Sequence, residues 1–204
     1  MTQPMMTLTA RFDVNQVDDG IDWLFADIDS NSTDDRTLTA PYWNRDIQFS
    51  AGQEFRIAIS ASDQEKTGFE SLEIIDCCVI TRPQILCCGK GILTRYAPPS
   101  LFVNCDGKQL GAIYRIEPSA FSVHSTGIDP SQGRKVTLLW NGNLTVGPYN
   151  GFWDLAFYVT VSIKRAHEEA RQLRVFYFDP EGEVGNGTDP PNAVMRISNG
   201  GTEA

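Results

Sequence analysis

Hydrophobic and polar residues alternate with a period of two along much of this chain. Successive side chains of a β-strand point to opposite faces, so such alternation predicts a strand with one buried face. The longest run covers residues 153–164, with its apolar positions at Trp153, Leu155, Phe157, Val159, Val161 and Ile163. The same pattern in residues 8–14 and 55–61 predicts two more strands of this kind.

Shorter runs supply the remaining predicted strands: 46–49, 74–80, 100–104, 111–116, 136–140, 173–178 and 194–197. The dipeptides Asp106-Gly107 and Asn141-Gly142 readily take the positive φ angles of tight hairpin turns, which favours antiparallel pairing. Residues 165–172 are predicted to be the loop of a hairpin between two strong strands. For the acidic region near residues 17–27 a helix is an alternative, although no apolar stripe supports it.

Nine or ten strands with almost no helix predict an all-β protein, a single antiparallel β-sandwich of immunoglobulin-like or jelly-roll type. Residues 1–197 are expected to form this one domain, and residues 198–204 a disordered tail. The predicted core combines the apolar positions of four strands: Ile57, Ile59, Leu138, Phe157, Val159, Val161 and Val175.

Composition narrows the classes of partner. The chain has 204 residues, with 17 Lys plus Arg and 26 Asp plus Glu, giving a net charge of -9. Proteins that bind nucleic acid concentrate cations, so nucleic acid is not an expected partner. No apolar stretch reaches the roughly 18 residues of a membrane span, and residues 1–9 lack the features of a secretory signal. A cytoplasmic protein that binds no membrane is expected.

The negative charge lies mainly in residues 1–70, which hold 13 acidic and 5 basic side chains. A solvated surface that keeps the protein in solution is the simpler interpretation, and a site for a cation or a basic partner is the alternative.

The five cysteines argue against a metal centre. Four of them form two adjacent pairs, Cys77-Cys78 and Cys87-Cys88, and the fifth is Cys105. Neighbouring residues on a strand point to opposite faces, and the C-x2-C spacing of zinc sites is missing. Thiols that pack as small hydrophobic groups in a reducing compartment are therefore predicted, and no cofactor is expected.

Catalytic signatures are missing from the sequence. No Gly-x-Ser-x-Gly elbow, phosphate loop, dinucleotide fingerprint or His-Glu-x-x-His motif occurs. The two histidines, His124 and His167, have no recognisable triad context, and His124 is predicted to lie in a strand or loop. A protein that is not an enzyme is therefore expected.

Aromatic residues beside amide and charged groups suggest a ligand site. A flat ring face with planar hydrogen-bonding groups is the chemistry of a carbohydrate site. The alternative is that Trp43 and Tyr149 close the ends of the sandwich. The candidate ligand-binding residues are Trp43, Arg45, Asp46, Tyr149 and Asn150.

A second candidate is a weak calcium site. Asp179, Glu181 and Glu183 alternate, as oxygen ligands do in calcium-binding loops. The EF-hand positions for glycine and for the closing glutamate are held by Val184 and Pro190, so an exposed acidic loop is the other interpretation.

The C-terminal part resembles a known family. A long alternating strand, a hairpin and the run Phe176-Tyr177-Phe178-Asp179-Pro180 are similar to the ending of the bacterial AidA/PixA inclusion-body proteins, over about a sixth of the chain. The resemblance implies a bacterial, cytoplasmic, β-rich protein that accumulates in inclusions, without established catalytic residues.

Together these features predict a non-enzymatic protein that associates with itself as a homo-oligomer. A lectin-like module that binds a carbohydrate or another small ligand, with or without calcium, is the alternative.

Overall fold

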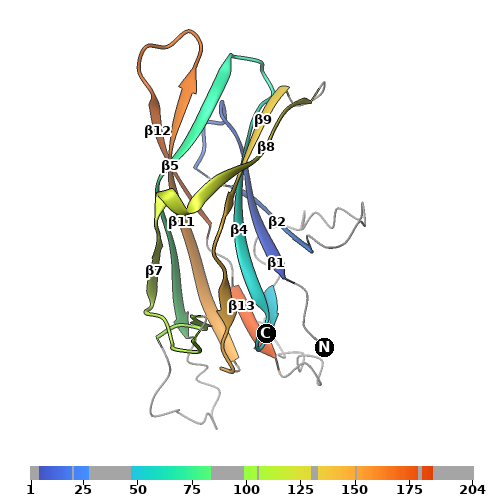
Figure 1. The fold of residues 1–204 in the computed structure, drawn as a ribbon, viewed down its shortest axis with the longest axis vertical. Coiled ribbons are helices and arrows are strands. Elements are labelled where there is room, and N and C mark those ends of the chain that lie inside the picture. The colour runs from blue at the N-terminus through green and yellow to red at the C-terminus, as the bar shows by residue number, and fades with distance from the viewer. Residues whose placement is uncertain are drawn as a thin grey trace, which may run out of the picture.

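Two β-sheets packed face to face form the fold in the computed structural model, which describes residues 5–19, 21–27, 47–83, 99–104, 106–129, 133–149, 151–178 and 181–185 (Figure 1). The predicted all-β sandwich is confirmed. No helix in these ranges is long and apolar enough to cross a membrane. Their helical structure is a single 3-10 turn, Pro118–Ala120.

The first sheet is built around β4, whose neighbours are β1 on one side and β9 and β10 on the other. β2 pairs with β1, β8 with β9, and the short β6 with β10. Its strands are β1 (Met6–Asp13), β2 (Asp22–Asp27), β4 (Glu54–Asp63), β6 (Phe102–Val103), β8 (Phe121–Asp129), β9 (Gly133–Trp140) and β10 (Leu144–Val146).

The second sheet is built around β11, the long strand that the alternation predicts. One side of β11 pairs with β5 along almost its whole length, and the other side pairs with β12 and then β13. β7 pairs with β5, and β3 with β13. The strands are β3 (Ile47–Ser50), β5 (Phe69–Pro83), β7 (Ile113–Ile116), β11 (Gly151–Arg165), β12 (Gln172–Phe178) and β13 (Glu181–Gly185).

Strand pairing is mostly antiparallel, with two parallel exceptions that the sequence did not predict. β1 runs parallel to β4, and β13 runs parallel to β3. Hairpin dipeptides govern only consecutive strands, whereas these pairs join strands that are not consecutive. Asp106-Gly107 forms the predicted tight turn, with Gly107 at a φ of +74°. Asn141-Gly142 does not form a hairpin turn. It separates β9 from β10, and both of these strands run antiparallel to β4.

The core lies between the sheets and confirms six of the seven predicted residues. Val175 is the exception, because its side chain is 52% exposed while that of its neighbour Phe176 is fully buried. The ring of Phe176 packs 4.3 Å from that of Phe12 across the sandwich. Both side-chain rows of β12 contain apolar residues, so periodicity alone does not identify the inward row.

Two other expectations need correction. The alternative helix over 17–27 is wrong, because Asp22–Asp27 is a strand that pairs with β1. β8 was not predicted, since its polar sequence has no alternating pattern. The loop at 165–172 is confirmed as the connection between β11 and β12. The predicted strand at 194–197 and the tail at 198–204 lie outside the described residues.

The chain reaches the first sheet from the second through the 3-10 turn, which joins β7 to β8 (Figure 1). β8 then pairs with β9 as a hairpin, and a register shift between Val123 and Ser125 leaves His124 as an extra residue. Gly133 begins β9 at a φ of +67°, and a Cβ atom there would lie 1.9 Å from the backbone oxygen of Asp63. This position therefore requires glycine.

Candidate functional site

Six large hydrophobic side chains lie exposed on the outward side of the second sheet. Each comes from β5, β7, β11 or β12, whose alternate residues point into the core. Between 40% and 65% of each side chain is exposed. We call this set the outer apolar face: Ile75, Ile113, Tyr158, Leu173, Val175 and Tyr177.

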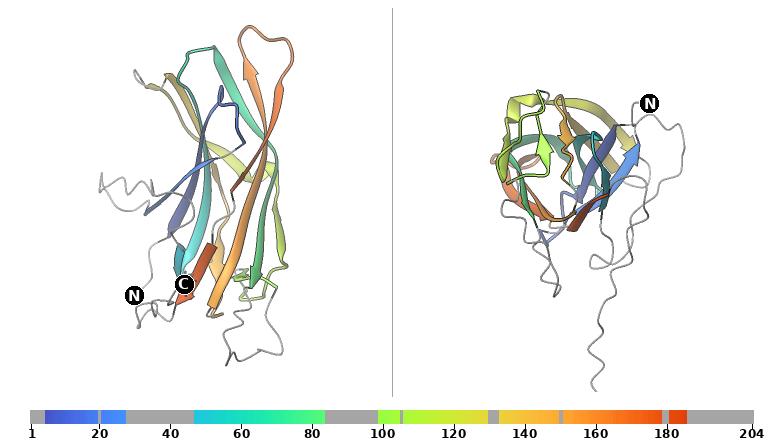
Figure 2. Two further views of the ribbon diagram at one scale, coloured as in Figure 1. Left: turned by 180° about the vertical axis from the view of Figure 1, so that it is seen from behind. Right: turned by 90° about the horizontal axis from the view of Figure 1, so that it is seen from below.

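Strand register brings this face together from distant parts of the chain. Tyr158 on β11 lies opposite Tyr177 on β12 and opposite Cys78 on β5. The two tyrosine rings are stacked, with centroids 6.3 Å apart and 27° between their planes. Thr160 lies opposite Val175 in the next row. The second sheet therefore presents an aromatic pair on its outward side, where β11 meets β12. The left view of Figure 2 shows the molecule from the opposite side to Figure 1.

Three ion pairs lie on the same side of the sheet. They join Arg82 to Asp154, Arg115 to Asp76, and Arg171 to Glu73, with N–O distances of 3.5 and 3.2 Å in the last two pairs. Exposed pairs of this kind add little to stability. Their importance is in the charge balance, because each Arg neutralises one carboxylate on a chain whose net charge is -9.

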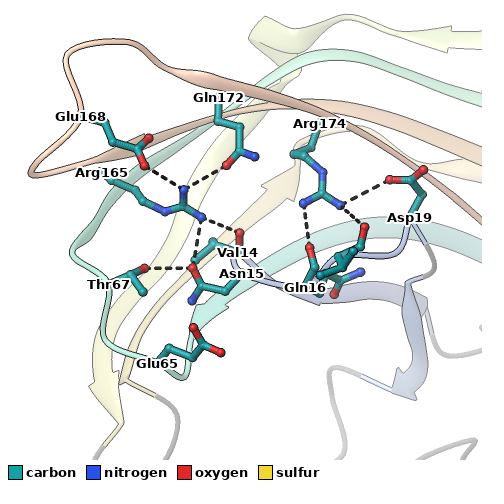
Figure 3. A pocket seen from close by; sticks show the side chains of 11 residues that line it. Val14, Asn15, Gln16, Asp19, Glu65, Thr67, Arg165, Glu168, Gln172 and Arg174 are labelled. Carbon is teal, nitrogen blue, oxygen red and sulfur yellow. Dashed lines mark hydrogen bonds and ion pairs between the residues drawn. The ribbon is translucent and has the colours of Figure 1, made fainter.

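A polar depression of about 630 Å³ lies at one end of the sandwich, between the segment after β1, the β4–β5 turn and the β11–β12 loop (Figure 3). Arg165 donates to the backbone oxygen of Val14 at 2.8 Å and also contacts Glu168. Arg174 donates to the backbone oxygens of Gln16 at 2.8 Å and Asp18 at 2.9 Å.

Both arginines of the depression act on the chain itself. Their side chains are only 15% exposed, and their guanidinium groups fasten residues 14–19 to β11 and β12. The backbone nitrogen of Tyr177 also donates to the oxygen of Asp19, at 3.3 Å. Within the described residues, the Arg165 Nε is buried without a hydrogen-bond partner. Since oxygen atoms of the chain already bind the terminal nitrogens of both guanidinium groups, the arrangement suits a structural clamp better than a binding site for an anion.

Asp63 ties together the turn beneath this depression. Its side chain is 2% exposed and accepts five hydrogen bonds: from the backbone nitrogens of Thr67, Gly68 and Phe69, from the Thr67 hydroxyl and from the Asn15 amide. Burial by itself would raise the pKa of this carboxyl, but the hydrogen bonds outweigh burial and lower the pKa from 3.8 to about 2. The carboxylate therefore holds the corner between β4 and β5 in its charged form.

The predicted carbohydrate site is only partly visible. Trp43, Arg45, Asp46 and Asn150 lie outside the described residues. Tyr149 is half-buried and packs against the core, and its backbone oxygen accepts a hydrogen bond from the Trp153 indole at 3.3 Å. A role of Tyr149 in ligand binding stays a prediction.

Two of the three predicted calcium ligands lie in a strand. Glu181 and Glu183 belong to β13, opposite Asp154 and Phe152 on β11, while Asp179 lies outside the described ranges. In the part of the chain that the structure describes, no group of three or more His, Cys, Asp or Glu side chains is close enough to hold a metal ion.

The cysteine pair on β5 behaves as the strand geometry predicts. Cys77 points into the core and Cys78 lies half-buried on the opposite side, both as free thiols. Burial, with smaller contributions from Cys78 and Asp76, raises the pKa of the Cys77 thiol to about 12. Burial also raises the pKa of Cys78. Cys77 is therefore a small hydrophobic group at neutral pH; Cys87, Cys88 and Cys105 lie outside the described residues.

Sequence reasoning missed Asp63, Arg165 and Arg174. One local signal was present: an aspartate at the end of an alternating run, followed by Thr67-Gly68, is typical of a side chain that caps a turn. No such signal exists for the arginines, because their acceptors lie about 150 residues away in the sequence.

Comparison with known proteins found no match to this chain among protein-family models, curated proteins or solved structures.

Proposed function

We propose that this chain is a non-enzymatic structural protein that associates with itself through the outer apolar face. The exposure of six large hydrophobic side chains on one side of one sheet carries this proposal. Contiguous apolar surface of this kind on a folded protein usually marks an interaction site. Tyrosine pairs are also common at the centres of interfaces.

Charge favours a second copy as the partner. Copies with a net charge of -9 repel each other at most points of contact. On the outer apolar face, however, three arginines form ion pairs with three carboxylates. These six side chains have no net charge, so they do not make two copies repel each other there. A basic partner would find stronger attraction elsewhere on the chain. This face is therefore better suited to itself than to a charged protein.

The size of the surface is sufficient for a dimer. β11 and β5 run the length of this face, whereas β12 has 7 residues and β7 has 4. At ~3.3 Å per residue and ~4.8 Å between strands, about 11 residues each of β11 and β5 together with β12 and β7 cover roughly 520 Å². Two such faces in contact bury on the order of 1,000 Å², at the lower limit of specific interfaces. Sheets that pack face to face cross at about 30°, and a two-fold axis would place the Tyr158–Tyr177 pairs of both copies near the centre.

The resemblance at the C-terminal end supports the same proposal. The aromatic run 176–180, which carries the resemblance to bacterial inclusion-body proteins, begins in β12, and β12 supplies three residues of the outer apolar face. Self-association in a bacterial cytoplasm, up to the formation of inclusions, is the role we infer.

Substitution of Val175 tests this proposal. Val175→Lys places a cation among the apolar side chains of the proposed contact, on the outer strand β12. Ala51→Lys is the control, because Ala51 is exposed in the turn between β3 and β4, away from the four strands of this face. We expect the average mass measured by light scattering to rise between 1 and 100 µM for the wild type and the control, and Val175→Lys to weaken association at least tenfold, since a buried unpaired charge is costly. A wild type that stays monomeric, or a Val175→Lys variant that associates equally well, would overturn the proposal.

A further inference from the structure

β8 is an edge strand that is exposed on both faces. Every residue from Ser122 to Ile128 is exposed, and within the described residues β8 pairs only with β9. Val123 lies opposite Leu138, whose side chain is buried in the core, yet Val123 is 63% exposed. Ile128 is 82% exposed. The second sheet therefore leaves the inner side of β8 uncovered.

Unlike β8, the edge strand β12 is covered by another segment of the chain. Residues 15–19 lie along β12, held by Arg174 and by the hydrogen bond from the Tyr177 nitrogen to Asp19. Natural sheets also protect edges with lysine, proline or inward-pointing charges. The sequence from Phe121 to Ile128 contains no proline and no Asp, Glu, Lys or Arg. In the part of the molecule that the structure describes, β8 thus lacks a covering segment and protective side chains. Its remaining protection is the β-bulge at His124, after which Ser125 to Asp129 pair regularly with β9.

We propose that β8 is a second self-association site, at which it pairs antiparallel with β8 of another copy across a two-fold axis. This pairing would join the first sheets of two copies into one continuous sheet. The backbone NH and CO groups on the open side of an edge strand are the groups that an added strand uses. Val123 and Ile128 of both copies then lie on the same side of the joined sheet.

The charge of β8 identifies a second copy as the occupant. Eight of its nine residues, Phe121 to Ile128, carry no Asp, Glu, Lys or Arg, and the one acidic residue, Asp129, is the last of the strand, whereas the whole chain carries -9. Two copies can therefore bring these strands together without placing carboxylates opposite each other. A peptide with a strong charge of either sign gains nothing from this strand, because β8 offers no ion-pair partner along those residues.

Two separate two-fold contacts have a geometric consequence. The outer apolar face belongs to the second sheet, while β8 belongs to the first. A protein with a single two-fold contact stops at a dimer, but one with two such contacts on different surfaces adds further copies, either in a closed assembly such as a tetramer or in an open chain. The edge contact does not depend on the face contact, and together they would produce assemblies larger than dimers.

Four proteins separate the two contacts: the wild type, Val123→Lys at the edge, Val175→Lys on the face, and the double variant. Light scattering at 100 µM is expected to give the wild type an average mass above that of two chains. Each single variant should stop at a dimer, and the double variant should remain at the monomer mass of 22.7 kDa. Ala51→Lys is again the control, because it introduces a cation at an exposed position outside both contacts.

Amide hydrogen exchange locates the edge contact. Peptides that cover residues 121–129 should become more protected as the concentration of Val175→Lys rises from 1 to 100 µM, and Val123→Lys should remove this increase. An increase that persists in the double variant, or a Val123→Lys protein with the same masses as the wild type, would overturn the edge proposal and leave the face proposal intact. A Val175→Lys protein that assembles like the wild type would contradict the face proposal alone.

Discussion

Replacing Asp63 with asparagine should reveal how much the β4–β5 corner depends on one buried carboxylate. Asparagine keeps the volume of the side chain but places an amide nitrogen among groups that are all donors. The lowering of the Asp63 pKa from 3.8 to about 2 corresponds to about 2 kcal/mol in favour of the charged form in the folded state. With donors left unpaired as well, we expect Asp63→Asn to lower the free energy of unfolding at pH 7 by about 3 kcal/mol.

The pH dependence of this loss identifies its cause. Because the folded-state pKa of Asp63 is lowered, its contribution is complete well above pH 3.8 and is lost as the pH falls towards 2. Linkage predicts that the difference between wild type and Asp63→Asn narrows by about 1 kcal/mol between pH 7 and pH 3, roughly half of the charge-dependent part.

Urea denaturation followed by intrinsic fluorescence, at pH 7, 5, 4 and 3, measures both quantities, preferably on the Val123→Lys, Val175→Lys double variant to avoid effects of association. Asp106→Asn, at an exposed turn position, is the control and should change stability by less than about 0.5 kcal/mol at each pH. If the difference in unfolding free energy between wild type and Asp63→Asn stayed constant down to pH 3, the reasoning would be refuted. The hydrogen bonds would then not stabilise the charged form of Asp63.

Three further outcomes are expected. Gly133→Ala should cost more than about 2 kcal/mol or prevent folding because of its positive φ and its contact with backbone, whereas Gly127→Ala, with open space around it, should be nearly neutral in thermal denaturation. Phe176→Ala should cost about 3–5 kcal/mol and Val175→Ala less than about 1 kcal/mol; the reverse order would show that β12 faces the other way. Cys77 should resist alkylation until the protein unfolds, as read by peptide mass spectrometry, and rapid labelling of the native protein would contradict its burial.

The fold class could be predicted from the sequence because several strands have one buried and one polar side. β11 is the clearest case: its inward row is uniformly apolar, so a period of two is enough to identify both the strand and its buried face. The same rule fails for β12, where Leu173, Val175 and Tyr177 alternate with Arg174 and Phe176. The row with Arg174 and Phe176 is the one that contacts the rest of the molecule, and Arg174 binds the backbone of residues 16 and 18. These partners are distant in the sequence, so the local pattern of β12 does not predict them.

The two candidate surfaces could not be predicted from the sequence for a related reason. The outer apolar face exists only because β12, β11, β5 and β7 are neighbours in this order, and sheet order is set by long-range pairing. β8 was not predicted because a strand that is exposed on both sides does not need alternating hydrophobic and polar residues. Tyr149, predicted as a ligand-binding residue from its chemistry, is half-buried and packs against the core, which the sequence does not show.

The parallel pairing of β3 with β13 also affects the order in which the protein can fold during synthesis. In the described part of the chain, β13 is the partner of β3, and about 130 residues separate the two strands. At 5–20 residues per second, a ribosome needs on the order of ten seconds to make that interval. β3 must wait through this time without its partner, so the second sheet is completed only when translation of the described chain is nearly over.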